Sequence, residues 1–337
     1  MSFLDTTSHE SSEHYSYLLT SMDEETIRLD GMEQPDVVWR RRIYPRDPNP
    51  RVHASDRRFV EGELRQFERS ILELIHHRGG AHWVNPPTGA ALAENKLLQL
   101  RIAAKAGAII PVTLVSRDPV EVKAFISEHG AVVVKPQIGH FWINDGEVAF
   151  QTQASIVSPS TPLDDDAIRV CPMIYQEKIK KVADIRVVKM GDSCTAIRME
   201  QPTAGDARID SRLNMFHPEM RASAFPVCAR IKAIMDAMCD QLGIVYASCD
   251  FAQTSEGDLV FLDLNPAGQF MFLESFVPSI PIMHQFTNFL IGKKDDRRVL
   301  TIDDFTKSDE YRYWEAHLSV GYGNAYRPSH VISEEVA

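Results

Sequence analysis

The stretch YASCDFAQTSEGDLVFLDLNP, residues 246–266, consists of two apolar runs joined by a polar turn centred on Glu256-Gly257. Apolar runs on either side of a Gly-containing turn predict a β-hairpin. If Glu256-Gly257 forms a tight loop, Asp250 lies directly opposite Asp263. Two carboxylates that face each other across a sheet repel unless a positive charge lies between them. This hairpin therefore constrains both the fold and the chemistry of the chain.

The same register gathers oxygen atoms on one face of the hairpin. Asn265 lies opposite Ser248, and strand alternation puts Asn265 on the same face as Asp263. The residues predicted to face the core are Val260, Leu262 and Leu264. Together, Asp250, Asp263 and Asn265 make the oxygen-rich donor set that Mg²⁺ prefers. A solvated face with aligned charges is the alternative, but a strand ending in D-x-N-P-x-G is apolar enough to favour the metal.

A second hairpin is predicted from Asp184 to Met199, with its turn at Met190-Gly191-Asp192. Asp184 and Arg186 share one face of it. A three-residue loop would bring Arg198 opposite Arg186, with the register not fixed by the sequence. Paired arginines favour an anion between them, such as a triphosphate or an acyl phosphate, because guanidinium groups bind such anions through charge-assisted hydrogen bonds. Exposed arginines on a solvated ladder are the alternative.

Two lysines stand where a strand or a helix meets a loop. Lys135 ends an apolar run and precedes Pro136, so its ammonium group lies at the lip of a buried sheet. Lys96 opens a predicted helix, where a cation opposes the helix dipole. Both positions suit an anionic ligand, although a lysine at a strand end is equally often a solubility device.

The segment Tyr175 to Ile179 is predicted to be a strand that leaves one subdomain for the next. Backbone groups of such a segment can pair with the edge of an adenine ring, and an edge strand without a ligand fits the same residues. No H-E-x-x-H, G-x-S-x-G or G-x-x-x-x-G-K-[ST] motif occurs in the sequence. The common hydrolase and P-loop functions are therefore disfavoured.

Composition excludes several other classes. A net charge of −11 disfavours nucleic acid as the main partner, because phosphate contacts require surplus Lys and Arg. No apolar run is long enough to cross a bilayer, and the N-terminus lacks the features of a signal peptide. The five cysteines form no C-x-x-C pair, so neither zinc nor a disulfide framework is indicated. We expect a cytoplasmic protein that binds neither membranes nor nucleic acid.

The remaining chain alternates helices and strands, as in α/β or α+β proteins. Helices are predicted at 56–77 and 94–106 and from Asp118, which should form a capping box with Glu121; strands are predicted at 81–84, 108–115 and 131–135. Residues 1–26 show little periodicity and are given no structure. The polar segment 137–172 is expected to form hairpins and a mobile flap. Residues 200–224 are expected to form another long loop, either functional or disordered.

In this order the pieces resemble the ATP-grasp superfamily: N-K, V-V-V-K-P, Q-E-K-I, D-I-R-V-V-K-M-G, S-C-D-F and F-L-D-L-N-P. The resemblance covers about residues 85–275. It implies an α+β fold in which a nucleotide is held between two α+β subdomains, preceded by a small α/β N-terminal domain. The implied parts are a reduced N-terminal domain at 1–90, a central subdomain at 91–175, and a C-terminal subdomain with the metal and phosphate site at 176–330.

The resemblance also implies roles for the residues described above. Phosphates of ATP are held by Lys96 and Lys135, adenine by Gln176, Glu177, Lys178 and Ile179, and ribose by Asp184. The phosphates or the acyl phosphate face Arg186 and Arg198, and two Mg²⁺ ions are held by Asp250, Asp263 and Asn265. The superfamily usually has Glu where this chain has Asp263, and the shorter side chain reaches two ions less readily.

Within the superfamily, W-R-R-R at 39–42, N-P at 85–86 and N-P-A-G-Q-F-M-F-L-E at 265–274 resemble the peptide maturases of microviridin-type graspetides. Such enzymes close side-chain lactones and lactams in a ribosomal precursor peptide. The resemblance implies a precursor with a leader segment and a core rich in Thr, Ser or Lys beside Asp or Glu. Asp210 and Arg212 form a D-x-R that resembles a substrate-contacting pair of that family. A homodimer is a further expectation.

The expected function is ATP-dependent ligation, in which Asp or Glu side chains of the precursor are activated as acyl phosphates and then attacked by a hydroxyl or an amine. One rival is an ATP-grasp ligase that adds amino acids to a protein or small-molecule carboxylate. A second rival is a nucleotide-binding module without turnover. A co-encoded short peptide with repeated Thr and acidic residues favours the first function, and its absence favours the first rival.

Overall fold

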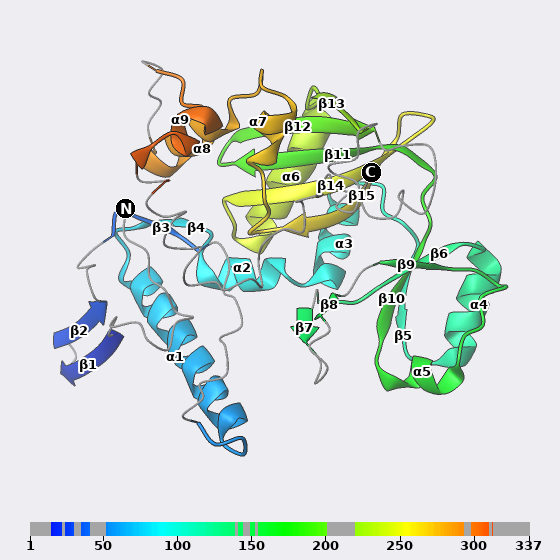
Figure 1. Cartoon of the computed structure of the whole chain (residues 1–337), viewed down its shortest axis with the longest axis horizontal. Coiled ribbons are helices and arrows are strands. Elements are labelled where there is room, and N and C mark those ends of the chain that lie inside the picture. The colour runs from blue at the N-terminus through cyan, green and yellow to red at the C-terminus, as the bar shows by residue number, and fades with distance from the viewer. Residues whose placement is uncertain are drawn as a thin grey trace, which may run out of the picture.

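The structure, a computed structural model, describes residues 15–21, 24–29, 35–40, 52–138, 141–143, 149–151, 154–200, 220–292, 298–309 and 312. Most of the helices pack against two antiparallel sheets, and a smaller N-terminal part lies beside them (Figure 1). The larger sheet has the strand order β13-β12-β11-β14-β15, and the smaller has the order β5-β10-β6-β9. Antiparallel sheets with separate helices confirm the predicted α+β class.

The N-terminal part contains a hairpin, a long helix and a parallel pair of strands (Figure 1). Strands β1 (Tyr15–Ser21) and β2 (Glu24–Leu29) are antiparallel, and β3 (Val37–Trp39) pairs in parallel with β4 (His82–Val84). Helix α1 (Arg57–Arg78) connects the parallel strands and confirms the helix predicted at 56–77. The sequence assigned no structure to residues 1–26, whereas β1 forms within their described part despite a weak apolar alternation.

The smaller sheet belongs to the region predicted as the central subdomain. Its strands are β5 (Thr113–Ser116), β6 (Val132–Lys135), β9 (Ser155–Val157) and β10 (Met173–Glu177), and its helices are α4 (Pro119–His129) and α5 (Asp165–Val170). Apolar side chains of both helices pack on this sheet around Val122 and Tyr175. Strands β7 (Phe141–Ile143) and β8 (Ala149–Gln151) form a hairpin, as expected within 137–172.

The start of α4 differs from the predicted capping box. Asp118 Oδ1 accepts a hydrogen bond from the Val120 backbone N–H at 2.8 Å, so Asp118 is the N-cap. Glu121 does not return a bond to Asp118: its Oε2 accepts a 2.7 Å bond from the Ser116 hydroxyl, and that hydroxyl oxygen accepts the Asp118 N–H at 2.9 Å. The predicted capping box is wrong because the Ser116 hydroxyl bonds both the Asp118 N–H and the Glu121 carboxylate, which would otherwise bond each other.

The larger sheet is covered by helices on both faces. Its strands are β11 (Lys181–Met190), β12 (Ser193–Glu200), β13 (Arg221–Ala224), β14 (Tyr246–Thr254) and β15 (Leu259–Asn265). Helices α3 (Lys96–Lys105) and α6 (Ala229–Leu242) bury one face around Ile185 and Phe251. Helices α7 (Phe272–Phe276) and α8 (Ile282–Ile291) bury part of the other around Ile197. The charged residues of the site lie on this second face.

The helix predicted at 94–106 is preceded by a separate helix, α2 (Pro87–Ala93). Helix α3 begins at Lys96, with Asn95 as its N-cap. Although α3 falls within residues 91–175, it packs against β15 and α6 of the larger sheet. Lys96 is thereby carried to the outer edge of that sheet.

Asn85 ties the N-terminal part to the larger sheet. Its side chain is 1% exposed and uses its full hydrogen-bonding capacity. The Oδ1 atom accepts the N–H groups of Val245 and Tyr246, both at 2.8 Å. The Nδ2 atom donates to the carbonyl oxygens of Tyr246 at 2.8 Å and Pro266 at 2.9 Å. One amide thus joins the start of β14 to the residue that follows β15.

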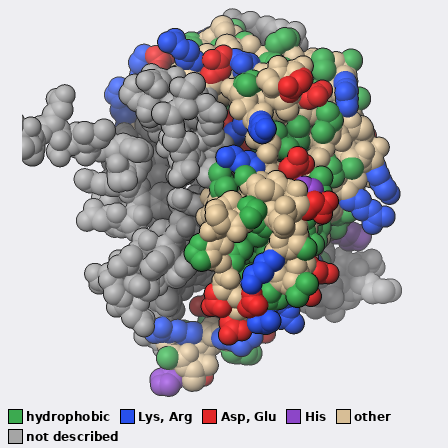
Figure 2. Space-filling model, turned by 90° about the vertical axis from the view of Figure 1, so that its right-hand side faces the viewer, with side chains coloured by type: hydrophobic (Ala, Val, Ile, Leu, Met, Phe, Trp, Pro, Cys, Tyr) green, Lys and Arg blue, Asp and Glu red, His purple; other side chains and the backbone are tan. Residues whose placement is uncertain are grey.

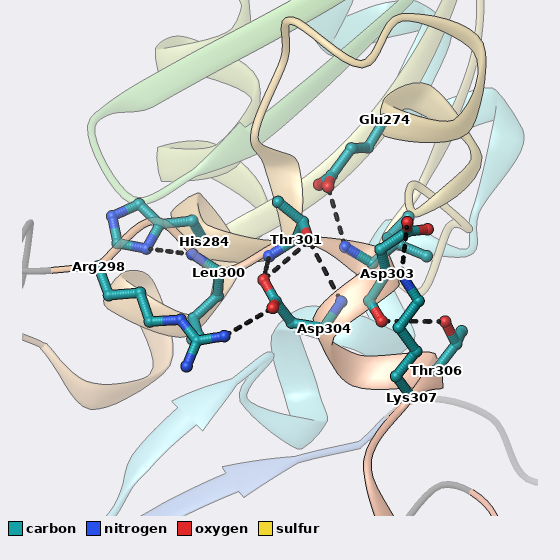
Figure 3. A network of polar contacts seen from close by, with 10 residues as sticks. Glu274, His284, Arg298, Leu300, Thr301, Asp303, Asp304, Thr306 and Lys307 are labelled. Atoms are coloured by element: carbon teal, nitrogen blue, oxygen red, sulfur yellow. Dashed lines mark hydrogen bonds and ion pairs between the residues drawn. The ribbon is translucent and has the colours of Figure 1, made fainter.

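Glu274 of α7 fixes the segment that follows α8 (Figure 3). Its carboxylate accepts the N–H of Met283 at 3.0 Å and the N–H of Ile302 at 2.9 Å. Ile302 is the first residue of α9 (Ile302–Thr306), and Thr301 and Asp304 form a capping box at the N-terminus of this helix. Buried carboxylates need such donors, so Glu274 anchors α8 and α9 to the end of the β15 loop.

The surface carries charges of both signs. On the face shown in Figure 2, acidic and basic side chains are interspersed among the described residues rather than gathered by sign. Within the described residues, no helix combines the length and the apolar character that a membrane span requires.

Candidate active site

The β14–β15 ladder brings the predicted carboxylates together. Asp250 lies opposite Asp263, and Ser248 lies opposite Asn265, which confirms the predicted register at these positions. On its other side, Asp250 lies opposite Arg186 of β11. Residues paired across antiparallel strands point to the same face. One row across three strands therefore carries Arg186, Asp250 and Asp263 in that order.

The turn of this hairpin is longer than predicted. The N–H of Thr254 donates to the carbonyl oxygen of Asp258 at 2.9 Å, so the loop holds Ser255, Glu256 and Gly257. Near the turn the ladder is one residue out of step with the pair of carboxylates. A bulge at Leu262 restores the register, because it adds one residue to β15.

The bulge also changes which residues enter the core. Phe261 and Leu264 are 0% and 1% exposed and pack beneath α3 and α6. Leu262 is only partly buried, and Val260 does not belong to that cluster. Val260 is itself 4% exposed, so the predicted burial is confirmed for Val260 and Leu264 and is wrong for Leu262, which lies at the bulge where strict alternation ends.

Asp250 is half enclosed by charged and polar groups. The Arg186 Nε lies 2.6 Å from Asp250 Oδ1 as an ion pair, without the alignment of a hydrogen bond. The Arg186 Nη1 donates to the Ser248 hydroxyl oxygen at 3.0 Å. Burial raises the pKa of Asp250, Arg186 lowers it, and Asp263 raises it further. The carboxylate is thus short of positive charge even with its arginine partner.

Two lysines from different elements converge on Asp263. Lys96 of α3 lies 2.5 Å from Asp263 Oδ1. Lys135, at the end of β6, donates to the carbonyl oxygen of the bulged Leu262 at 3.5 Å. Burial lowers the pKa of Lys135, Asp263 raises it, and Lys96 lowers it again. The acidic pair is therefore flanked by cations on both sides, an arrangement that suits a phosphate chain together with a divalent cation.

Phe272 and Gly268 frame the site from the loop after β15. The Arg186 guanidinium carbon lies 5.7 Å from the centre of the Phe272 ring, within cation–π range. Asn265 Oδ1 accepts the Ala267 N–H at 2.9 Å, which turns the chain back over the sheet. A Cβ atom on Gly268 would lie 2.4 Å from the Ser248 Cβ and 3.4 Å from the Asn265 Cβ. Only glycine allows this close approach.

Gly268→Ala should lower the rate of ATP turnover about 10- to 100-fold, because the new methyl group pushes Ser248 and Asn265 off the row that aligns them. The expected loss of stability is about 1–3 kcal/mol. Steady-state kinetics and thermal unfolding measure the two effects. Gly62→Ala is the matched control, since a Cβ on Gly62 meets nothing within 4 Å. Full turnover in Gly268→Ala would contradict this interpretation of the site.

Arg198 does not join this cluster. The hairpin closes with Met190 opposite Ser193, so its loop is the pair Gly191-Asp192, with Gly191 at φ 55°. Arg186 therefore lies opposite Ile197, and Arg198 lies opposite Ile185 on the other face. The predicted pairing of Arg198 with Arg186 is wrong, because the loop is one residue shorter than expected.

On its own face, Arg198 has other partners. Its Nε donates to Gln253 Oε1 at 2.8 Å, and its Nη1 pairs with Glu200. Asp184, which lies on the face of Arg186, is 4% exposed and forms a 2.7 Å ion pair with Lys181. Asp184 thus follows Ile179, the last of the residues that the resemblance assigns to adenine, by five positions.

In the segment from Gln176 to Ile179, which the resemblance assigns to adenine, part of the backbone already forms hydrogen bonds within the protein. Gln176 is buried and donates from Nε2 to the Thr113 hydroxyl at 2.9 Å. The N–H of Glu177 donates to the Val112 carbonyl oxygen at 3.0 Å, and the N–H of Lys178 donates to that of Ala131 at 3.2 Å. Among the described residues, no backbone hydrogen bond uses the N–H of Ile179 as donor. Of the four predicted residues, Ile179 is therefore the one whose backbone N–H is best placed to donate to the edge of an adenine ring.

The donor set for a metal is small in the part of the chain that the structure describes. Asp210 and Arg212 lie outside the described residues. In the described part, no group of three or more His, Cys, Asp or Glu side chains could hold a metal. The available donors are Asp250, Asp263 and the amide of Asn265. Two opposed carboxylates beside an amide fit a hard cation that keeps water or phosphate ligands.

Two residues hold the site together in ways that the sequence did not reveal: Gln99 carried no signal, and the N-P motif marked Asn85 without its partners. Gln99 of α3 is 1% exposed and bonds the backbone of Leu264, while Asn85 bonds Pro266. Both contacts join residues more than 160 positions apart. Phe272 is nearer in sequence and lies within the motif at 265–274, which could have drawn attention to it.

The chain has the ATP-grasp fold. It is similar to a RiPP-associated ATP-grasp ligase of Chryseobacterium gregarium, solved in complex with ADP and a leader and core peptide, at 23% identity over 87% of this chain and 88% of that chain, with a TM-score of 0.73. It is also similar to the macrocyclase MdnC of Microcystis aeruginosa bound with precursor peptide MdnA, at 22% identity over 86% and 90% of the two chains, with a TM-score of 0.70.

Curated relatives match only in part. A glutathione synthetase of Rhodopseudomonas palustris is 44% identical over 70 residues, and one of Bradyrhizobium diazoefficiens is 29% identical over 141 residues. The matched segments span 20% and 42% of the two relatives and 21% and 41% of this chain. No protein-family model matches the chain.

Proposed function

We propose that this protein is an ATP-dependent carboxylate ligase that closes ester or amide cross-links in a ribosomal precursor peptide. The observation that carries the proposal is the row of Arg186, Asp250 and Asp263, with Lys96 and Lys135 at its end. Opposed carboxylates flanked by cations suit a nucleotide triphosphate with its metal, and the ATP-grasp fold supplies the setting. The similar ligases solved with peptides and ADP support the peptide as substrate.

Mg²⁺ would be held by Asp250, Asp263 and Asn265, with two ions as the expectation. Bound there, it would neutralise phosphate charge and orient the phosphoryl group. The similar ATP-grasp ligase PsnB has been solved in complex with a minimal precursor, Mg and ADP, which supports the same pairing of metal and nucleotide for this chain.

The side chains of the site then account for the chemistry. Lys96, Lys135 and Arg186 neutralise the phosphates, so that a substrate carboxylate can attack the γ-phosphorus and release ADP. The acyl phosphate formed on the peptide is attacked by a hydroxyl or amine of the same peptide, and phosphate leaves. No nucleophile from the protein is required. Catalysis rests on positioning and on fixed charges.

Other parts of the proposal rest on the resemblance in sequence. Asp210 and Arg212 are proposed to contact the peptide, Arg198 the phosphates, and Gln176, Glu177, Lys178, Ile179 and Asp184 the nucleoside. For Arg198 this proposal requires a contact from the opposite face of the sheet. A core rich in acidic residues and Thr, a homodimer and a cytoplasmic location also stay predictions.

Mass spectrometry of a candidate precursor after incubation with ATP and Mg²⁺ tests the proposed function. We expect a loss of about 18 mass units, one water, for each ring closed. A gain of an amino-acid residue would instead show the ligase activity of the first rival, which the partial similarity to glutathione synthetases keeps in view. ADP release without any change in the peptide would contradict the proposal.

A further inference from the structure

The outer edge of β15 is completed by groups that are not a strand. Strand β15 is the last strand of the larger sheet, so its outward N–H and C=O groups need partners from elsewhere. The N–H of Phe261 donates to the carbonyl oxygen of Ile109 at 2.8 Å. Further along, at Leu264, the partner is a side chain of α3.

Gln99 takes the place of a neighbouring strand at Leu264. Its Oε1 accepts the Leu264 N–H at 3.0 Å, and its Nε2 donates to the Leu264 carbonyl oxygen at 2.8 Å. The same Nε2 donates to the carbonyl oxygen of Ala93 at 2.5 Å, which ties it to the end of α2. Gln99 is 1% exposed, so these bonds have no competition from water.

Leu264 lies between the two residues of β15 that face the site, Asp263 and Asn265. A backbone held at Leu264 from both its N–H and its C=O cannot shift or rotate without breaking two buried hydrogen bonds. The directions of the neighbouring side chains are fixed as a result. Gln99 therefore acts on the donor set through the backbone, from the outer edge of β15.

Lys96 stands on the same helix, one turn before Gln99, and neighbours at this spacing share a helix face. Lys96 reaches Asp263 at 2.5 Å while Gln99 holds the next residue of the same strand. We propose that Gln99 is a positioning residue that sets the distance between the lysine that binds phosphate and the carboxylate that binds the cation. The inference rests on the proposed function, because that function gives Lys96 and Asp263 these two ligands.

This arrangement makes a prediction that a purely structural role does not. If Gln99 aligns Asp263 and Asn265, its loss should weaken the binding of the cation more than the binding of the nucleotide. The reason is that Lys135 and Arg186 come from other elements and remain in place. Residues that orient metal ligands from behind typically contribute about 10- to 100-fold to metal affinity. If Gln99 only stabilises the core, cation and nucleotide affinity should change together, in proportion to the loss of stability.

The test is Gln99→Met in the full chain, which keeps the length of the side chain and removes its polar groups. Mn²⁺ binding is titrated by electron paramagnetic resonance with saturating ADP, and ADP binding is measured separately by calorimetry in EDTA. We expect Mn²⁺ affinity to fall about tenfold or more, with ADP affinity in EDTA within about threefold of the wild type. Val122→Ala is the control for stability, since Val122 is buried in the central subdomain, far from β15.

Three results separate the possibilities. Mn²⁺ affinity equal to that of Val122→Ala, or a parallel fall of Mn²⁺ and ADP affinity, would overturn the role of Gln99. A wild-type protein that binds ADP but no Mn²⁺ would overturn the proposed function itself. Should Gln99→Met not fold, Gln99→Asn serves in its place, because it keeps the uncharged amide and shortens its reach to Leu264 by one methylene group, and the same comparison decides.

Discussion

Asp263→Asn is expected to reduce the rate of ATP turnover about a thousandfold at saturating ATP, equivalent to about 4 kcal/mol of lost transition-state stabilisation. Asn keeps the size of the side chain and can still accept a hydrogen bond from Lys96, whose Nζ lies 2.5 Å from Asp263 Oδ1. What it removes is the charge that, together with Asp250, would hold the cation. Asp250→Asn should behave alike, with the added loss of the ion pair to Arg186.

Steady-state release of ADP with increasing Mg²⁺ measures this effect. The control is Asp258→Asn, a carboxylate of the same hairpin that lies exposed at its turn. Asp258→Asn should leave both turnover and the dependence on Mg²⁺ at wild-type values. Turnover within tenfold of the wild type in Asp263→Asn would show that the β14–β15 face does not hold the metal.

Asn85→Leu should cost the protein about 4 kcal/mol or more of stability. It removes four hydrogen bonds and leaves two N–H groups and two carbonyl oxygens of Val245, Tyr246 and Pro266 without partners at a site that is 1% exposed. Each buried polar group left unpaired costs about 1–3 kcal/mol. A drop in melting temperature of about 8 °C or more is the expected result in differential scanning calorimetry.

Asn95→Ala provides the comparison for Asn85. Asn95 is the N-cap of α3, and its side chain accepts a single hydrogen bond, from the Leu98 N–H at 3.0 Å. Its removal should cost only about 1 kcal/mol, as for other N-caps. If Asn85→Leu melted no lower than Asn95→Ala, the hydrogen bonds of Asn85 between the N-terminal part and the larger sheet would not contribute the predicted stability.

The sequence predicted the pair of Asp250 and Asp263 correctly through two errors that cancel. A two-residue loop at Glu256-Gly257 gives the same pairing as the three-residue loop of the structure followed by a bulge at Leu262. Alternation shows which residues share a face over short runs, but it carries no signal for a bulge. The same uncertainty over loop length at Gly191 placed Arg198 on the wrong face.

Polar contacts between residues far apart in the chain could not be predicted from local sequence patterns. The residues that supply chemistry, such as Lys135 at a strand end, have a recognisable position relative to their own element. The N-P motif marked Asn85 without indicating its partners, nothing marked Gln99, and only the fold brings these two residues to Pro266 and Leu264. The motifs therefore predicted the groups that face the ligand better than those that hold them.

The most direct test of the site is a crystal structure of the protein with ADP and Mn²⁺, using anomalous scattering to locate the metal. We predict a peak on the face of the larger sheet shared by Asp250, Asp263 and Asn265, at about 2.1 Å from at least one carboxylate oxygen. The phosphates of ADP should lie within reach of Lys96 and Lys135. Bound ADP with no anomalous peak beside Asp250 or Asp263 would contradict the account.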